Sequence, residues 1–219
     1  MLVFFLTFAF LSVPSFNAKT INVDGDASDW AGVSQLFSDP VDMPGASWAD
    51  IISCYVTDDS VYLYVRIDYV GGPEITWGPH LLYLDVDQNP ATGQAYRGIG
   101  ADYVVDFYTT PPALLELPGG GHVSDIIYAV NKASHFIESC ISLADIGVEA
   151  GQKIDLILQA DASSDYAPDE GHATYTTRVL KPLGGDVFQI NKISILTPYL
   201  IIGIVILTTT TVLIKKRKH

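Results

Sequence analysis

Residues 81–93 read L-L-Y-L-D-V-D-Q-N-P-A-T-G, a strand pattern followed directly by a turn. Leu82, Leu84 and Val86 alternate with polar or aromatic residues, which is the period of a strand with one buried face. Asn89 and Pro90 come next, and both are typical of tight turns. We therefore expect a half-buried antiparallel strand that bends sharply into a polar loop.

This loop carries oxygen-bearing side chains at alternate positions. Asp85, Asp87 and Asn89 are each two residues apart, and Thr92 follows closely. Carboxylate and amide oxygens in a curling loop are typical ligands of calcium, at about 2.3–2.6 Å. The same string also suits a polar turn that holds no ion. The pattern gives the hypothesis of a calcium site on Asp85, Asp87 and Asn89.

The rest of the middle of the chain also has strand patterns. The clearest alternation lies at residues 61–68, where aliphatic residues occupy every second position. Strands are also expected at 20–23, 50–56, 101–109, 113–117, 123–130, 135–141, 153–160 and 173–180. Short strands separated by turns about every 8–12 residues favour a sandwich over a parallel α/β fold. The predicted fold is all-β, an antiparallel, jelly-roll-like β-sandwich over residues 19–183.

The charge of the chain is strongly negative and unevenly distributed. The formal net charge is −13, and residues 19–192 hold all 25 acidic residues but only 8 of the 12 basic ones. Such a surface repels the phosphates of nucleic acids, so a nucleic-acid partner is not expected. It attracts cations, because a divalent ion relieves the repulsion between carboxylates.

The two ends of the chain have the composition of targeting segments. Residues 1–18 begin with an apolar run too short to span a bilayer, which is typical of a signal peptide, although an uncleaved anchor is an alternative. After a linker at 184–192, residues 193–214 contain no charge and are long enough to cross a membrane. The basic tail at 215–219 marks the cytoplasmic side. We expect a single-pass cell-membrane protein whose acidic domain is extracellular. Whether the last helix is retained or removed as a sorting signal is open.

The chain has two cysteines, Cys54 and Cys140, both in strand-like runs. A disulfide between them would close a long loop and stabilise the fold by about 2–4 kcal/mol. Two buried free thiols are the alternative, because cysteine packs as a small hydrophobic residue.

Five motifs occur in an order that resembles the carbohydrate-binding module family 9-like domains of the wider DOMON-like group. The motifs are I-N-V-D-G-D-A-S-D-W, A-D-I-I-S-C-Y-V-T-D-D-S-V-Y-L-Y-V-R-I-D, L-Y-L-D-V-D-Q-N-P-A-T-G, G-A-D-Y-V-V-D-F and I-E-S-C-I-S-L-A-D-I-G. The resemblance covers residues 20–180 and implies a sandwich with structural calcium and, in some members, sugar binding. It adds Asp24, Asp26, Asp50 and Asp102 to the expected acidic ligands, and Glu138 matches a further motif position. Ser142 stands where the family commonly has proline, and the sugar-binding tryptophans of the family have no clear counterpart.

Two groups of residues could form a saccharide site. Tyr62, Tyr64 and Arg66 share one face of the 61–68 strand, and aromatic rings stack on sugar rings while arginine binds hydroxyl or acid groups. Alternatively, the second sheet covers this face and both tyrosines are core residues. Trp48 and Trp77 lie in polar loops, where they could be ligand platforms or loop anchors.

No arrangement typical of an enzyme stands out. The histidines lack metal or triad spacing, no nucleophile motif occurs, and no pair of carboxylates is singled out for a glycosidase. Haem ligation by Met43 and His80 is a minor alternative that the DOMON-like resemblance suggests. We expect a non-enzymatic extracellular binding module, with a glycan or cell-envelope polysaccharide as partner. The alternatives are a structural surface protein that self-assembles and, with less support, a glycan-processing enzyme.

Overall fold

A computed structural model describes residues 19–161 and 164–179. The predicted signal peptide, linker, membrane-spanning helix and basic tail lie outside these residues. Within them, strands dominate, and a short 3-10 helix, η1 (Ala27–Trp30), lies near the N-terminal end. Among these residues no helix is long and apolar enough to cross a membrane.

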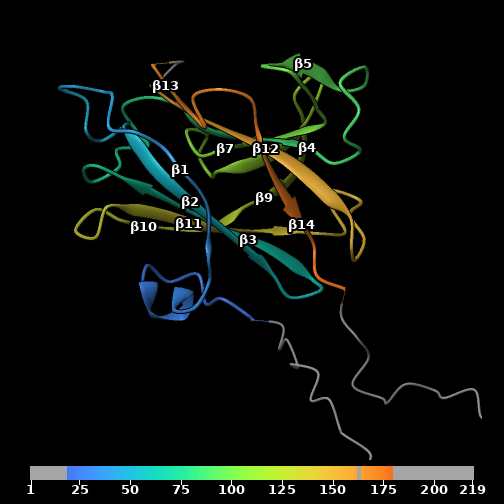
Figure 1. Cartoon of the computed structure of the whole chain (residues 1–219), viewed down its shortest axis with the longest axis horizontal. Coiled ribbons are helices and arrows are strands. Elements are labelled where there is room, and N and C mark those ends of the chain that lie inside the picture. The colour runs from blue at the N-terminus through green and yellow to red at the C-terminus, as the bar shows by residue number, and fades with distance from the viewer. Residues whose placement is uncertain (1–18, 162–163, 180–219) are drawn as a thin grey trace, which may run out of the picture. The chain divides into compact units, whose positions relative to one another are not determined.

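The strands form two antiparallel sheets and a small hairpin (Figure 1). The first sheet has the order β1 (Gln35–Ser38), β2 (Ile51–Asp58), β3 (Tyr62–Tyr69), β11 (Phe136–Ser142) and β10 (Ile127–Asn131). The second has the order β13 (Asp165–Ala167), β12 (Lys153–Ala160), β4 (His80–Asp85), β7 (Tyr103–Asp106), β8 (Ala113–Glu116) and β9 (Gly121–Asp125), and β14 (Ala173–Thr176) also pairs with β12. The hairpin consists of β5 (Gln94–Tyr96) and β6 (Ile99–Ala101).

One hydrophobic core joins the two sheets. Leu63, Val65 and Ile67 of β3 alternate into it, as the period-two pattern predicted. From the other sheet, Leu82 and Leu84 of β4 enter the same cluster and are fully buried. The two sheets therefore pack face to face. The prediction of an all-β fold with antiparallel sheets is confirmed.

The outer face of the second sheet carries a second cluster. Tyr83, Val104 and Ile157 form a row across three neighbouring strands, because they are register partners. Ile99 and Ala101 of β6 cover this row. The hairpin that follows the predicted calcium loop is thus packed onto the sheet.

The outer face of the first sheet is covered by the N-terminal segment, residues 19–33. Ile21 and Trp30 of this segment pack against Tyr64 and Cys140, which are cross-strand neighbours on β3 and β11. The prediction of a strand at 20–23 is wrong, since these residues pair with neither sheet. Their apolar side chains alternate because the segment lies on the sheet as a cover.

The expected strand at 123–130 is divided between the two sheets. Its first part belongs to β9, which pairs with β8, and its second part belongs to β10, which pairs with β11. Ile126 lies between them and is buried in the shared core. The chain therefore crosses from one sheet to the other at this residue.

The predicted disulfide is not formed. Cys54 and Cys140 are both free and buried. Cys54 belongs to the core between the sheets, and Cys140 belongs to the cluster on the opposite face of the first sheet. Because the sheet separates the two sulfurs, the alternative of two free thiols is correct.

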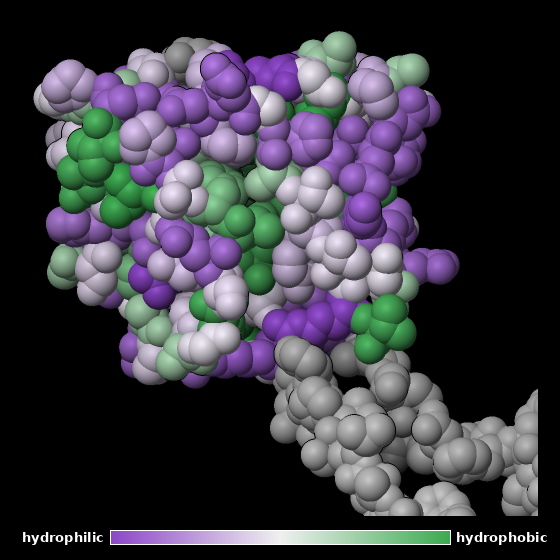
Figure 2. Space-filling model, viewed as in Figure 1, coloured by the Kyte–Doolittle hydropathy of each residue, from purple (hydrophilic) through white to green (hydrophobic). Residues whose placement is uncertain are grey.

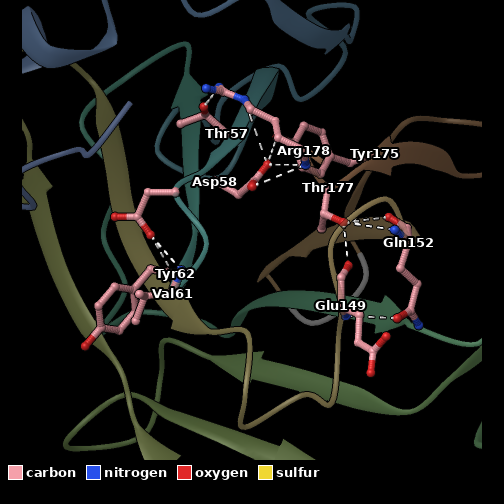
Figure 3. A network of polar contacts seen from close by, with 10 residues as sticks. Thr57, Asp58, Val61, Tyr62, Glu149, Gln152, Tyr175, Thr177 and Arg178 are labelled. Atoms are coloured by element: carbon pink, nitrogen blue, oxygen red, sulfur yellow. Dashed lines mark hydrogen bonds and ion pairs between the residues drawn. The ribbon is translucent and has the colours of Figure 1, made fainter. Parts of the chain in front are cut away.

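A polar network anchors the end of the described chain (Figure 3). The buried Asp58 carboxylate accepts hydrogen bonds from the Tyr175 hydroxyl and, at 3.1 Å, from the Arg178 main-chain N–H. Thr177 is buried between Glu149 and Gln152: its hydroxyl donates to the Glu149 carbonyl at 2.7 Å. Residues after β14 are therefore tied both to β2 and to the turn before β12.

Hydrophilic residues cover most of the face shown in Figure 2, and hydrophobic residues gather there in small groups. The described part of this face therefore carries no large continuous hydrophobic patch.

Candidate metal centre

The loop that follows β4 brings three carboxylates together. Asp85 ends β4, Asp87 lies in the loop, and Asp102 lies between β6 and β7. One oxygen of each lies within 4.8 Å of the others. The antiparallel pairing of β4 with β7 places Asp102 here, since Leu84 and Tyr103 are register partners. Asp102 also donates its N–H to the Leu84 carbonyl at 2.8 Å.

The loop is held by its own polar side chains. Asp87 Oδ1 accepts the Asn89 N–H at 2.9 Å, and its Oδ2 accepts the Thr92 hydroxyl at 2.9 Å. Asn89 Oδ1 accepts the Ala91 N–H at 3.1 Å, so this side chain shapes the turn. The structure thus places Asn89 in the same loop, but its side-chain oxygen already has a hydrogen-bond partner.

Two glycines allow the loop to lie against the β5–β6 hairpin. Gly93 has φ +61°, and a Cβ there would clash with the Ala101 carbonyl oxygen. A Cβ on Gly100 would clash with the carbonyl oxygens of Asn89 and Thr92. Close backbone contact therefore fixes the loop over the carboxylates.

Asp85 is the most enclosed of the three acidic residues, with 1% of its surface exposed. Its Oδ2 accepts the Gly100 N–H at 3.0 Å, whereas its Oδ1 is buried and has no hydrogen-bond partner. A buried carboxylate oxygen without a partner is costly unless a proton or a cation satisfies it.

The Asp102 carboxyl is also in surroundings that disfavour its charged form. Burial raises its pKa, and the nearby charges of Asp87 and Asp85 raise it further. Hydrogen bonds from main-chain N–H groups, including the one from Val86 at 2.9 Å, act in the opposite direction. A divalent cation would remove this repulsion, and an all-oxygen set suits calcium.

The other predicted ligands lie elsewhere. Asp24 accepts hydrogen bonds from Asn22 and from the Asp26 N–H, and Asp26 caps η1 by accepting the Ser28 N–H at 2.9 Å. These two carboxylates therefore organise the N-terminal segment. Asp50 belongs to a separate acidic group near the start of β2.

The predicted aromatic face on β3 is largely enclosed. Tyr64 is 3% exposed and its hydroxyl donates to Asp59 at 2.8 Å. Arg66 forms an ion pair with Asp68 at 2.7 Å and lies over the Phe136 ring. Tyr62 is half-buried against Tyr64. The alternative that the second sheet covers this face is wrong about the covering layer, because the N-terminal segment lies there, but Tyr64 is a core residue as that alternative expected.

Trp77 and Trp48 form a more accessible aromatic pair. Trp77 is 68% exposed, and its ring meets the half-buried Trp48 edge-on with centroids 5.6 Å apart. Trp48 in turn contacts the buried His80, whose Nδ1 lies 3.0 Å from the Tyr69 hydroxyl. His80 is thus an aromatic support at the start of β4. No local spacing links His80 to the two tryptophans, because their segments meet only in the folded chain.

Asp42 and Asp165 are acidic residues that the sequence did not single out as ligands. They lie with Asp50 in the second acidic group. More than a hundred residues separate Asp50 from Asp165, so no local spacing signals this group.

No protein-family model matches the chain, and no curated protein matches it. The resemblance to carbohydrate-binding module family 9-like domains therefore remains a prediction from the five motifs.

Proposed function

We propose that this protein is a calcium-stabilised extracellular binding module, with a jelly-roll-like sandwich tethered by a C-terminal membrane helix. The buried, unpartnered Oδ1 of Asp85 beside Asp87 and Asp102 carries the calcium part of the proposal. The cation would offset most of the charge of the three carboxylates and hold the loop against the hairpin. The uncharged run at 193–214 and the basic tail support the tether.

The ligand proposed for the module is a saccharide. Trp77 presents an exposed indole that Trp48 supports from the side. An aromatic ring fixed in this way can stack on the apolar face of a sugar ring. The acidic surface disfavours polyanions, so a neutral glycan or cell-envelope polysaccharide is the better partner.

The calcium part is tested by chemical unfolding of the purified full-length protein with calcium and with a chelator. At a calcium concentration a hundredfold above its Kd, the free energy of unfolding should rise by about 2.7 kcal/mol. Asp85→Asn should lose the increment that the ion at this site contributes. Asp145→Asn removes an exposed charge elsewhere and should keep it. Equal responses of the two variants would refute the assignment of the site.

The saccharide part is tested on a glycan array with the same protein. Trp77→Ala should weaken binding at least tenfold for any glycan that the wild type binds. Tyr108→Ala is the matched control, because Tyr108 is also a large exposed aromatic residue but belongs to the segment after β7. A wild-type protein that binds no glycan would contradict the saccharide proposal.

The extracellular location is tested by adding protease to intact cells. The protease should digest the acidic domain, and a domain that stays intact would contradict this location.

A structural surface role is the second candidate, and the edge strand β10 favours it. Ile127 on this strand is 58% exposed, and β10 has a neighbour on one side only within the described sheet. An exposed edge strand can pair with the same edge of another copy. Sedimentation should then show oligomers that Ile127→Lys dissociates, whereas a strict monomer would argue against assembly.

A further inference from the structure

A second group of carboxylates lies where the two sheets meet. Asp42 and Asp50 come from the segment that joins β1 to β2 in the first sheet, and Asp165 begins β13 in the second sheet. One oxygen of each lies within 4.8 Å of the others. Asp165 Oδ2 accepts the Ile51 N–H at 2.7 Å, so the group already links a strand of each sheet.

The main chain fixes these carboxylates but leaves buried oxygens without partners. Asp50 is 1% exposed, and its Oδ2 accepts the Met43 N–H at 3.2 Å while its Oδ1 is unpartnered. Asp39 is 9% exposed: its Oδ1 accepts the Asp169 N–H at 3.2 Å, and its buried Oδ2 has no partner. The two carboxylate oxygens without a hydrogen-bond partner, Asp50 Oδ1 and Asp39 Oδ2, are therefore buried away from solvent.

The carboxylates in and next to this group raise one another's pKa. Burial, together with the charges of Asp169 and Asp165, raises the pKa of Asp39 to about 7. Burial and the charges of Asp42 and Asp50 raise the pKa of Asp165 to about 6. Like-charged carboxylates near one another disfavour the ionised form, and a positive charge among them favours it.

A nearby arginine does not supply that charge to the group. Arg97 donates to the main-chain oxygen of Asp169 and lies over the Tyr166 ring, with its guanidinium carbon 4.1 Å from the ring centroid. These contacts direct it to a carbonyl and to an aromatic face. The carboxylates can then be compensated at neutral pH by a bound cation or by a shared proton, and the cation is the one that also supplies a partner for the buried Oδ1 of Asp50.

We propose that Asp42, Asp50 and Asp165 form a second divalent-cation site, which takes calcium and joins the two sheets. The donors are all oxygen atoms, which suits a hard cation, and water would complete the six to eight ligands that calcium takes. The unpartnered Oδ1 of Asp50 is the observation that separates this site from a chance acidic cluster. The site is independent of Asp85, Asp87 and Asp102, and it does not rest on the proposed function.

Calcium binding to the full-length protein, measured by isothermal titration at neutral pH, tests the proposal. The number of calcium ions bound per chain is compared between the wild type and Asp50→Asn. Asp50→Asn should bind one ion fewer. Asp42 is exposed, so Asp42→Asn serves as a second variant if Asp50→Asn fails to fold. It should weaken the affinity for the same calcium ion at least tenfold. Asp145→Asn is the control and should bind as the wild type does.

Hydrogen exchange supplies a readout at the site itself. Calcium should slow exchange of the Ile51 N–H, which donates to Asp165, in the wild type and in Asp85→Asn but not in Asp42→Asn. Unchanged stoichiometry and affinity in both Asp50→Asn and Asp42→Asn would overturn the proposal. So would a wild type whose Ile51 exchange responds to pH but not to calcium, because a shared proton would then take the place of the cation.

The two proposals can fail separately. If the Asp85-dependent ion is absent and the Asp50-dependent ion is present, the calcium part of the proposed function is refuted and the second site stands. The reverse result removes the second site alone.

Discussion

Replacing Glu138 by glutamine should release the N-terminal segment from the first sheet. Glu138 lies on β11 and is fully buried. Its Oε1 accepts the N–H groups of Asp24 at 2.8 Å and Gly25 at 2.5 Å, and its Oε2 accepts the Trp30 indole N–H at 2.7 Å. One carboxylate thus holds three donors of a segment that is more than a hundred residues away in sequence.

The size of the effect follows from these contacts. A glutamine oxygen can still accept the two main-chain N–H groups, but its amide nitrogen then faces the Trp30 N–H, donor against donor. A hydrogen bond to a charged group contributes about 1.5–3 kcal/mol, and an unsatisfied buried donor costs about 1–3 kcal/mol. Because the two remaining bonds also lose their charge assistance, we expect the free energy of unfolding to fall by about 3–5 kcal/mol.

Urea unfolding followed by tryptophan fluorescence measures this loss. Glu116→Gln is the control, because Glu116 is exposed on β8 and should change stability by less than about 0.5 kcal/mol. Trp30→Phe, which removes one of the three donors and leaves a smaller aromatic ring, should fall between the two. Hydrogen exchange of the Asp24 and Gly25 N–H groups should accelerate in Glu138→Gln. A loss below about 1 kcal/mol would refute the reasoning.

Three further predictions follow from buried residues. Leu84→Ala should destabilise the fold by about 2–5 kcal/mol in urea unfolding, and the half-buried Leu115→Ala should cost less, because the completely buried Leu84 leaves the larger cavity. Burial lowers the pKa of His80 to about 4, although the Asp161 charge acts against this shift. In the unfolded chain the histidine pKa is about 6.5, so between pH 6.5 and 4 the unfolded chain binds more protons than the folded one. The contribution of neutral, buried His80 to the free energy of unfolding is therefore complete above about pH 6.5. About 3 kcal/mol of stability is lost as the pH falls to about 4. Unfolding curves of His80→Gln across this range should lack that part of the slope, and an unchanged slope would contradict it. A reductant should leave the stability of the native protein unchanged, since Cys54 and Cys140 are free thiols, and a mass two units below that of the dithiol form would show the opposite.

Local patterns were sufficient for much of the framework. The alternation at 61–68 placed Leu63, Val65 and Ile67 on the core face of β3, and the structure confirms this. The hydrophobic run at 153–160 is β12 with the expected bounds. Both succeed because the period of a strand fixes which side chains share a face, whatever partner the strand later finds.

Other features depended on contacts between distant parts of the chain. The segment around Ile21 has the alternation of a strand but no partner in either sheet, and a period alone does not reveal whether hydrogen bonds are available. The change of sheet at Ile126 left no strong turn signal, because the residue that makes the crossing is itself buried.

The candidate sites divide in the same way. The spacing of Asp85 and Asp87 around a tight turn was visible in the sequence, because a loop of this size brings its own side chains together. Asp102 joins them through the pairing of β4 with β7, and the group of Asp42, Asp50 and Asp165 exists only where one sheet packs against the other. The sequence by itself determined strand faces, the acidic character and the bend after β4, all of which are local properties. Tertiary structure alone decided which carboxylates meet, which tyrosine is covered and on which face each cysteine lies, because these depend on sheet order and packing between residues far apart in the chain.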